Sequence, residues 1–174
     1  MASTAHRVYP IAVELLRKGP PHNQLLSRIT DYIALCGNLS GELVHLPFNH
    51  LEHVISLGHL SYPGQADEDE MRRYTLGEMA SSVTSILEQI PGLAPALSQA
   101  CENKTDITHL RMVLTPHELA MVPFETANVP KGAPGGAGTS LLLQSAAPVT
   151  LTREVRGVST VDIKWPRRPR VLFA

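Results

Sequence analysis

The sequence predicts a mixed fold of α-helices and β-strands, either α/β or α+β. Apolar runs with strand-like alternation and runs with helical spacing follow one another along 174 residues, and no internal repeat is visible. The length suits one domain, since domains usually contain about 100–200 residues. Charged residues make up 18% of the chain, with 15 Lys and Arg against 16 Asp and Glu, so a folded domain is expected rather than a disordered chain.

The first elements are predicted from hydrophobic spacing. Alternating apolar residues over 6–17 predict a strand, and three- and four-residue spacing over 24–36 predicts an amphipathic helix. A short apolar run over 42–48 is interrupted by a proline, which predicts a strand that ends near the proline or lies at a sheet edge. A short helix over 50–57 would begin after Asn49, a good N-cap residue.

The longest predicted helix covers residues 67–90. Four acidic residues at 67–70 stand where the helix dipole is positive, with Asp67 and Glu70 spaced as in a capping box, and Pro91 ends the helix. A further short helix is predicted over 93–101.

The remaining third of the chain is predicted to contain strands and loops. An apolar run over 108–115 predicts a buried strand, and residues 119–122 after a proline turn predict a return strand or second short strand. Glycine and proline over 128–139 predict a mobile surface loop. Two further strands are expected over 148–155 and 170–174.

Four histidines within fifteen positions suggest a metal site as one hypothesis. Zinc needs three or four converging ligands, usually with cysteine or carboxylate among them, and the spacing here matches no closed zinc pattern. Exposed histidines on a short helix are the preferred interpretation, and a His-rich metal-binding domain is a weaker alternative. The four residues are His45, His50, His53 and His59.

The two cysteines predict neither a disulfide framework nor a nucleophile. Cys36 falls on the apolar face of a predicted helix and should be an inert buried thiol, while Cys101 follows a helix end. The glycine-rich stretch 132–138 lacks the following Lys-Ser/Thr of a phosphate-binding loop. We therefore expect no cofactor and no metal.

Composition also bears on location and partners. No run approaches the roughly 18 apolar residues of a membrane span, and the first seven residues lack the apolar segment of a secretory signal. A cytoplasmic protein with reduced thiols and no membrane partner is expected. The net charge of −1 makes direct binding of nucleic acid an unfavoured hypothesis.

The stretch 110–125 resembles the signature of CHAT domains, a caspase-like (clan CD) family of cysteine peptidases that often occurs with repeat or sensor domains in bacteria. Residues 141–153 and 170–174 are similar to the family's next block and to the first strand of its central sheet. The positions that match the motif, after an apolar strand and a tight turn, are Leu119, Val122, Pro123, Phe124 and Glu125.

The resemblance implies a three-layer, caspase-like α/β fold of which 1–174 would be the incomplete N-terminal part. Residues 1–107 would form a strand and helical region, and 108–174 an outer β-hairpin, the Gly/Pro loop and the start of the central sheet. The family's His-Gly element is absent from this sequence, and neither cysteine stands in the family's Asn/Ser-Ala-Cys context. The resemblance therefore implies no catalytic residue here, with Glu125 and Arg153 as candidate organising charges near the sheet edge.

The function implied is that of a signal-activated cysteine peptidase in bacterial defence or regulated proteolysis. Its His-Cys dyad would lie outside this chain, which would be inactive alone. The implied partners are the remaining catalytic part of the peptidase, a sensor or repeat module, and a protein substrate. The alternative is a non-catalytic scaffold or interaction module of the same fold.

Overall fold

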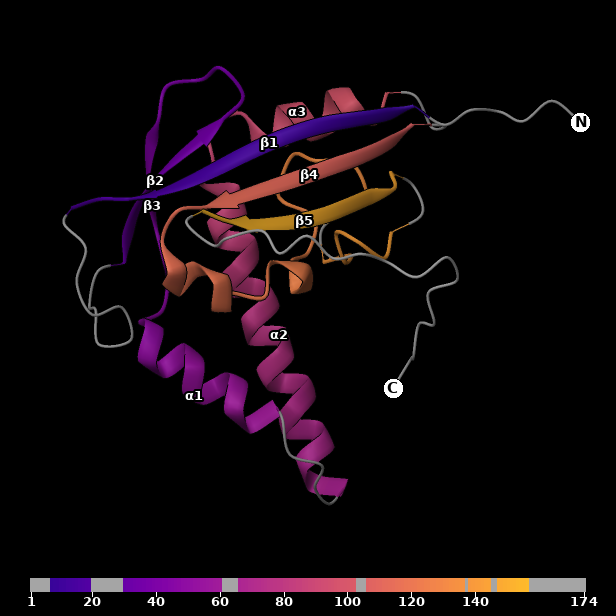
Figure 1. The fold of residues 1–174 in the computed structure, drawn as a ribbon. Coiled ribbons are helices and arrows are strands. Elements are labelled where there is room, and N and C mark those ends of the chain that lie inside the picture. Colours follow the sequence, from indigo (N-terminus) through magenta and orange to yellow (C-terminus); the bar gives the residue numbers. More distant parts are fainter. Residues whose placement is uncertain are drawn as a thin grey trace, which may run out of the picture.

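The computed structural model describes residues 7–19, 30–60, 66–102, 106–136, 138–144 and 147–156. Within these ranges the chain forms one five-stranded mixed sheet with three α-helices and two 3-10 helices (Figure 1). The strands are β1 (Val8–Arg17), β2 (Asp31–Cys36), β3 (Glu42–His45), β4 (Ile107–Leu114) and β5 (Val149–Val155). The helices are α1 (His50–Leu60), α2 (Ala66–Glu88), α3 (Leu93–Ala100), η1 (His117–Met121) and η2 (Phe124–Thr126).

The strand order is β3-β2-β1-β4-β5. β1, β4 and β5 run parallel, with Leu15 level with Leu114 and Leu114 level with Val155. β2 and β3 run antiparallel to their neighbours and form an outer hairpin on the other side of β1. The carboxyl ends of the three parallel strands therefore meet at one edge of the sheet.

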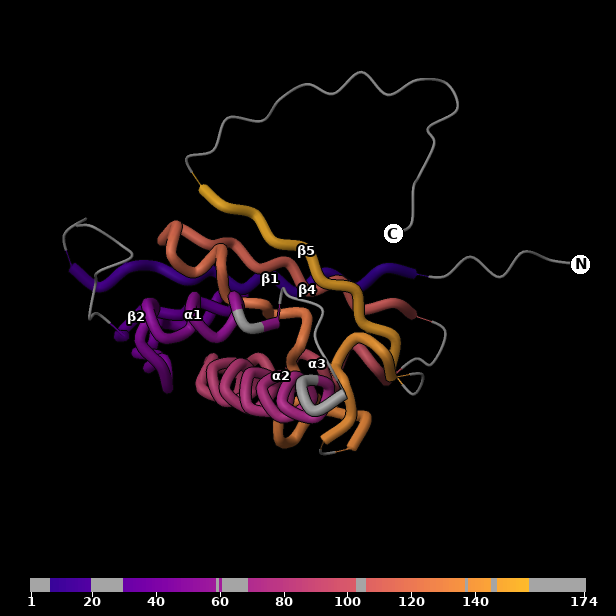
Figure 2. Tube along the Cα trace, turned by 90° about the horizontal axis from the view of Figure 1, so that it is seen from below, coloured from indigo at the N-terminus to yellow at the C-terminus, as the bar shows by residue number. Residues whose placement is uncertain are grey.

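One face of the sheet is covered by helices. All three α-helices lie on the same side of the sheet (Figure 2), and alternate residues of each strand point into the core between the two layers. The buried strand residues include Ile11, Val13, Leu15, Tyr32, Ala34, Leu110, Met112 and Leu114. They belong to one apolar cluster with Val83, Ile86, Leu87, Leu93 and Leu97 from the helices.

The opposite face of the sheet carries a mixture of apolar and polar side chains. Val8 and Leu43 are each about half exposed. On β4 and β5, Arg111 forms an ion pair with Glu154, and His109 lies 2.9 Å from the Thr152 hydroxyl. The described residues thus form two layers, a sheet and a helical layer.

Most of the elements predicted from spacing are confirmed. The strands expected over 6–17, 42–48, 108–115 and 148–155 are β1, β3, β4 and β5, and β3 lies at a sheet edge as expected. The three α-helices also begin where they were predicted. The Asn49 Oδ1 atom accepts a hydrogen bond from the Glu52 amide at 2.8 Å, which is the predicted N-cap.

The helix predicted over 24–36 is wrong in its second half. Residues 31–36 form strand β2, while 24–29 lie outside the described residues. The cause is that Tyr32, Ala34 and Cys36 are buried at two-residue spacing with partly buried apolar residues between them. An apolar run on both faces cannot be assigned by periodicity alone, and antiparallel pairing with β1 decides its conformation. Gly37 has a φ of 60° in the turn between β2 and β3.

The return strand predicted over 119–122 is also wrong, and with it the outer β-hairpin expected within residues 108–174, since the outer hairpin of the described sheet is β2–β3. This segment belongs to η1, and Pro123 and η2 follow it. The physical reason is that both edges of β4 are already paired, one with β1 and the other with β5. No edge of β4 remains for a hairpin partner, so the chain packs Leu119 and Phe124 into the core instead.

Other expectations fall on less regular parts of the chain. The described part of the loop 128–139 contains no helix or regular strand, and an isolated bridge joins Asn128 to Ser140. The side chain of Asp67, the proposed capping residue, lies outside the described residues. So does the strand predicted over 170–174.

Candidate functional site

The main polar cluster of the described residues lies at the carboxyl edge of the parallel strands. Arg17 ends β1, and Glu118 lies in η1, just beyond the end of β4. Tyr32 comes from the start of β2, and His50 is the first residue of α1. The strand ends and the turns that follow them bring together four side chains from four separate segments. In open α/β sheets this edge is where binding and catalytic groups gather.

Hydrogen bonds join the four side chains into one buried network, here called the clamp. The Arg17 Nη2 atom lies 2.6 and 2.5 Å from the two carboxylate oxygens of Glu118. The Tyr32 hydroxyl donates to Glu118 Oε1 at 3.1 Å and lies 2.6 Å from Nε2 of His50. Because the phenol has only one hydrogen, Nε2 of His50 must be the donor in the second bond.

The clamp is enclosed by the core. The Arg17 and Glu118 side chains are only 10% and 2% exposed, and Tyr32 is fully buried. Burial, and then the Glu118 carboxylate, raise the pKa of Tyr32 far above its ordinary value, so the phenol stays protonated and keeps donating. Such a network fixes the relative positions of β1, β2, α1 and η1, because each side chain supplies a hydrogen-bond partner that another one needs in a low-dielectric site.

One donor of the clamp has no partner among the described residues. The Nη1 atom of Arg17 is buried and makes no hydrogen bond there, although Nη2 is fully engaged. A buried guanidinium nitrogen without an acceptor is costly, so water or a group outside the described residues is expected to accept its hydrogen bonds.

The sequence proposed Glu125 and Arg153 as organising charges, and the structure brings them together. The Arg153 Nε atom lies 2.8 Å from Glu125 Oε1, in a half-exposed ion pair. The Nη1 atom of the same guanidinium donates to the carbonyls of Ala120 and Val122 at 2.7 and 3.3 Å. Arg153 thus ties β5 to η1 and η2. Whether this pair organises a functional site stays a prediction.

Neither cysteine makes a hydrogen bond to a histidine within the described residues. Cys36 is buried in β2, on a strand rather than on the predicted helix, and burial raises the pKa of its thiol. A raised pKa disfavours the reactive thiolate. Cys101 follows the end of α3, as predicted, and its Sγ lies 3.8 Å from the Thr108 hydroxyl.

The expectation that the histidines are exposed is wrong for two of them. His50 and His53 are 3% and 5% exposed, because the inner face of α1 packs on the sheet and η1. His45 is exposed and bonds Asp31 at 2.9 Å, and the side chain of His59 lies outside the described residues. Within the described part of the chain, no three His, Cys, Asp or Glu side chains are placed to hold a metal ion.

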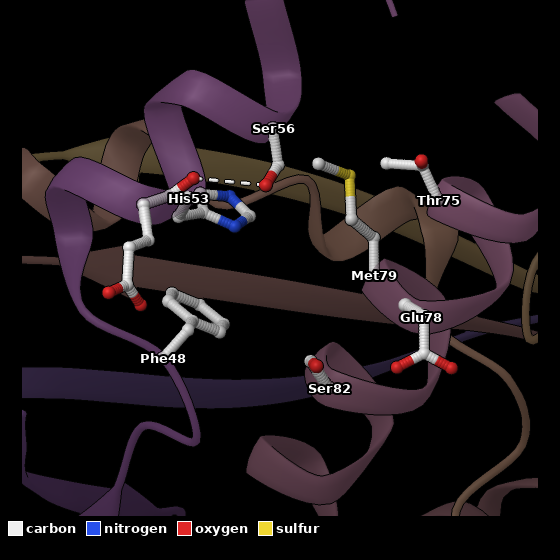
Figure 3. Close-up of a pocket in the computed structure, with 8 residues that line it drawn as sticks. Phe48, His53, Ser56, Thr75, Glu78, Met79 and Ser82 are labelled. Atoms are coloured by element: carbon white, nitrogen blue, oxygen red, sulfur yellow. Dashed lines mark hydrogen bonds between the residues drawn. The ribbon is translucent and has the colours of Figure 1, made fainter. Parts of the chain in front are cut away.

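A pocket of about 190 Å³ lies between α1 and α2. His53 lines it beside Phe48, and the two rings stack with centroids 4.4 Å apart and an interplanar angle of 16°. Figure 3 shows the nitrogen-bearing edge of the His53 ring directed toward the side of the pocket formed by Met79. Burial lowers the pKa of His53, so the imidazole is neutral at pH 7.

Sequence reasoning did not identify the clamp. Arg17 and Glu118 are 101 positions apart, and no local pattern pairs them. One signal was present, since Glu118 is an acid between the apolar strand and the apolar positions Leu119 and Val122. A charge enclosed in this way needs a buried partner.

None of the helices among the described residues combines the length and the apolar character needed to cross a bilayer. Comparison of the chain with protein-family models, with curated proteins and with solved structures finds no match.

Proposed function

We propose that this chain is the N-terminal part of a CHAT-type, caspase-like cysteine peptidase whose His-Cys dyad lies outside these 174 residues. The observation that carries the proposal is the edge where β1, β4 and β5 end. Three parallel strands point their carboxyl ends the same way, and the clamp fixes that edge. A dyad on neighbouring parallel strands would converge at the same edge.

Two further features support the proposal. β5 is an edge strand of the described sheet, so a further parallel strand can pair with it. All three α-helices cover one face of the sheet, which leaves the other face for the second helical layer of a three-layer fold (Figure 2). In this arrangement the chain supplies the outer hairpin β2–β3, the helical layer and the first parallel strands.

The motif of the resemblance has a structural role that fits this assignment. Phe124 is fully buried beneath the sheet, and Pro123 separates η1 from η2. Glu125 follows directly and forms the ion pair with Arg153. We assign this pair the role of holding β5 in register with the carboxyl edge of the parallel strands. For the whole protein we propose the activity of a regulated peptidase in bacterial defence. The partners are then a sensor or repeat module and a protein substrate.

The test begins with the gene downstream of codon 174. A His-Gly element and a later Ala-Cys, each after a predicted strand, support the proposal, and an immediate stop codon contradicts it in favour of a non-catalytic scaffold of the same fold. The longer polypeptide is then treated with an irreversible thiol-directed peptidyl probe. We expect labelling of the downstream cysteine and its loss when that cysteine is replaced by alanine.

The cysteines of this chain provide the matched controls. Cys36→Ala and Cys101→Ala should keep probe labelling, because neither thiol is placed beside a histidine base in the described structure. Loss of labelling in Cys101→Ala with the fold intact would place the nucleophile in this chain and contradict the proposal.

A further inference from the structure

The pocket between α1 and α2 has a chemistry that the proposed peptidase does not use. It lies within the helical layer, and its lining includes Phe48, His53, Ser56, Glu78 and Met79. Its volume of about 190 Å³ is smaller than the ~300–1,000 Å³ that enclose a drug-sized ligand. The pocket therefore suits a small group or a single side chain.

A buried ring nitrogen in the wall of the pocket has no hydrogen-bond partner among the described residues. His53 is only 5% exposed, and its Nε2 makes no hydrogen bond to the described residues. Burial lowers the pKa of the ring, so the imidazole is neutral at pH 7 and carries a single N–H. With that proton on Nδ1, Nε2 presents a lone pair to the pocket. A hydrogen-bond donor would satisfy it.

The charge of the lining favours a cation. Two acids, Glu52 and Glu78, line the pocket, and no Lys or Arg is among its described lining residues. The Phe48 ring and the Met79 thioether supply apolar walls. A guanidinium is planar and weakly hydrated and stacks on aromatic rings, whereas an ammonium is strongly hydrated, so these walls favour the guanidinium.

We infer that the α1–α2 pocket binds the guanidinium group of an alkylguanidine or of an arginine side chain. Nε2 of His53 accepts one N–H, and Glu78 at the α2 side supplies the opposite charge. The inference is independent of the His-Cys dyad, because every residue it uses belongs to this chain and none to the strand edge.

The experiment titrates the 174-residue chain with n-butylguanidinium while the imidazole ¹⁵N resonances are observed by NMR. We expect a saturable shift of the His53 Nε2 resonance, with a Kd on the order of 1 mM for so small a ligand. n-Butylammonium and the neutral N-butylurea should bind at least about fivefold more weakly, since one lacks the planar donor fork and the other the charge.

Two variants and one control locate the site. Glu78→Gln removes an exposed charge and should weaken binding about threefold, while His53→Phe removes the acceptor, keeps the stack on Phe48, and should weaken binding about tenfold. Glu70→Gln, an exposed acid on α2 that is not among the lining residues, should bind like the unmodified chain. Thermal melting checks that each variant is folded. If His53→Phe does not fold, Glu78→Gln still tests the site, because an exposed position tolerates the substitution.

The source of the guanidinium is separated with a blocked peptide. Tighter binding of acetyl-Gly-Arg-Gly-amide than of n-butylguanidinium supports the site with an arginine side chain as its ligand, and weaker binding supports it with a free alkylguanidine. Three results would overturn the inference. They are no saturable shift, equal binding of n-butylammonium or N-butylurea, and equal losses in Glu78→Gln and Glu70→Gln.

Discussion

Two charged pairs on the same sheet differ in their surroundings. The Arg17–Glu118 pair of the clamp is almost wholly enclosed, whereas Arg111 and Glu154, on the open face, are about half exposed. Each joins an arginine to a carboxylate from a neighbouring element. Enclosure decides what each pair contributes, because a buried charge left alone has no water to replace its partner, while an exposed one does.

The strongest way to test this difference is to remove one charge from the clamp. Glu118→Gln keeps the shape but leaves the Arg17 guanidinium buried without a counter-ion, so the free energy of unfolding should fall by about 3–5 kcal/mol. Urea denaturation followed by circular dichroism measures the loss. The double variant Arg17→Met with Glu118→Leu should recover part of it, because it leaves no buried charge. A loss below about 1 kcal/mol in Glu118→Gln would show that the pair is solvated.

A neutral member of the clamp should have a smaller effect. Tyr32→Phe removes the phenol that donates to Glu118 and accepts from His50, so two buried groups each lose a hydrogen bond. The free energy of unfolding should fall by about 1–3 kcal/mol in the same urea experiment. Tyr74→Phe, on an exposed position of α2, is the control and should change little. Equal effects in the two variants would contradict the network.

The clamp and the sheet also differ in how far the sequence predicts them. The strands at 6–17 and 108–115 and the helices follow from local periodicity, because each buries one face. β2 was missed because it is apolar on both faces. The clamp could not be predicted because its four members come from segments that meet only in the folded chain. Burial of His50 and His53 could not be predicted for the same reason, since Tyr32, which His50 contacts, and the α2 side chains beside His53 come from other segments.

The buried histidine gives a difference that pH can measure. Burial lowers the pKa of His53 in the folded state, while the unfolded imidazole keeps its ordinary value near 6.5. Below about pH 6.5 the unfolded chain binds more protons, so the free energy of unfolding should fall as pH decreases from there toward the folded-state pKa. His50, Glu52 and Glu78 are the other ionisable groups around this ring.

Urea denaturation at a series of pH values between 7 and 5 measures this contribution. In His53→Phe the slope should become shallower, because the group that gains a proton on unfolding is gone. His109→Gln, on the open face of the sheet, is the control for the loss of a histidine. The same flattening in both variants, or none in His53→Phe, would show that His53 is not the group responsible.

The smallest loss of unfolding free energy is expected for the Arg111–Glu154 pair on the open face of the sheet. Glu154→Gln breaks the pair with Arg111, but water can solvate the remaining guanidinium, so the loss should stay within about 1 kcal/mol and shrink further in 1 M salt. A loss close to that of Glu118→Gln would mean that the open face is covered in the 174-residue chain. In the longer polypeptide proposed above, a second helical layer would bury this pair. The same substitution should then cost more and lose its salt dependence, which makes Glu154→Gln a measure of whether that layer exists.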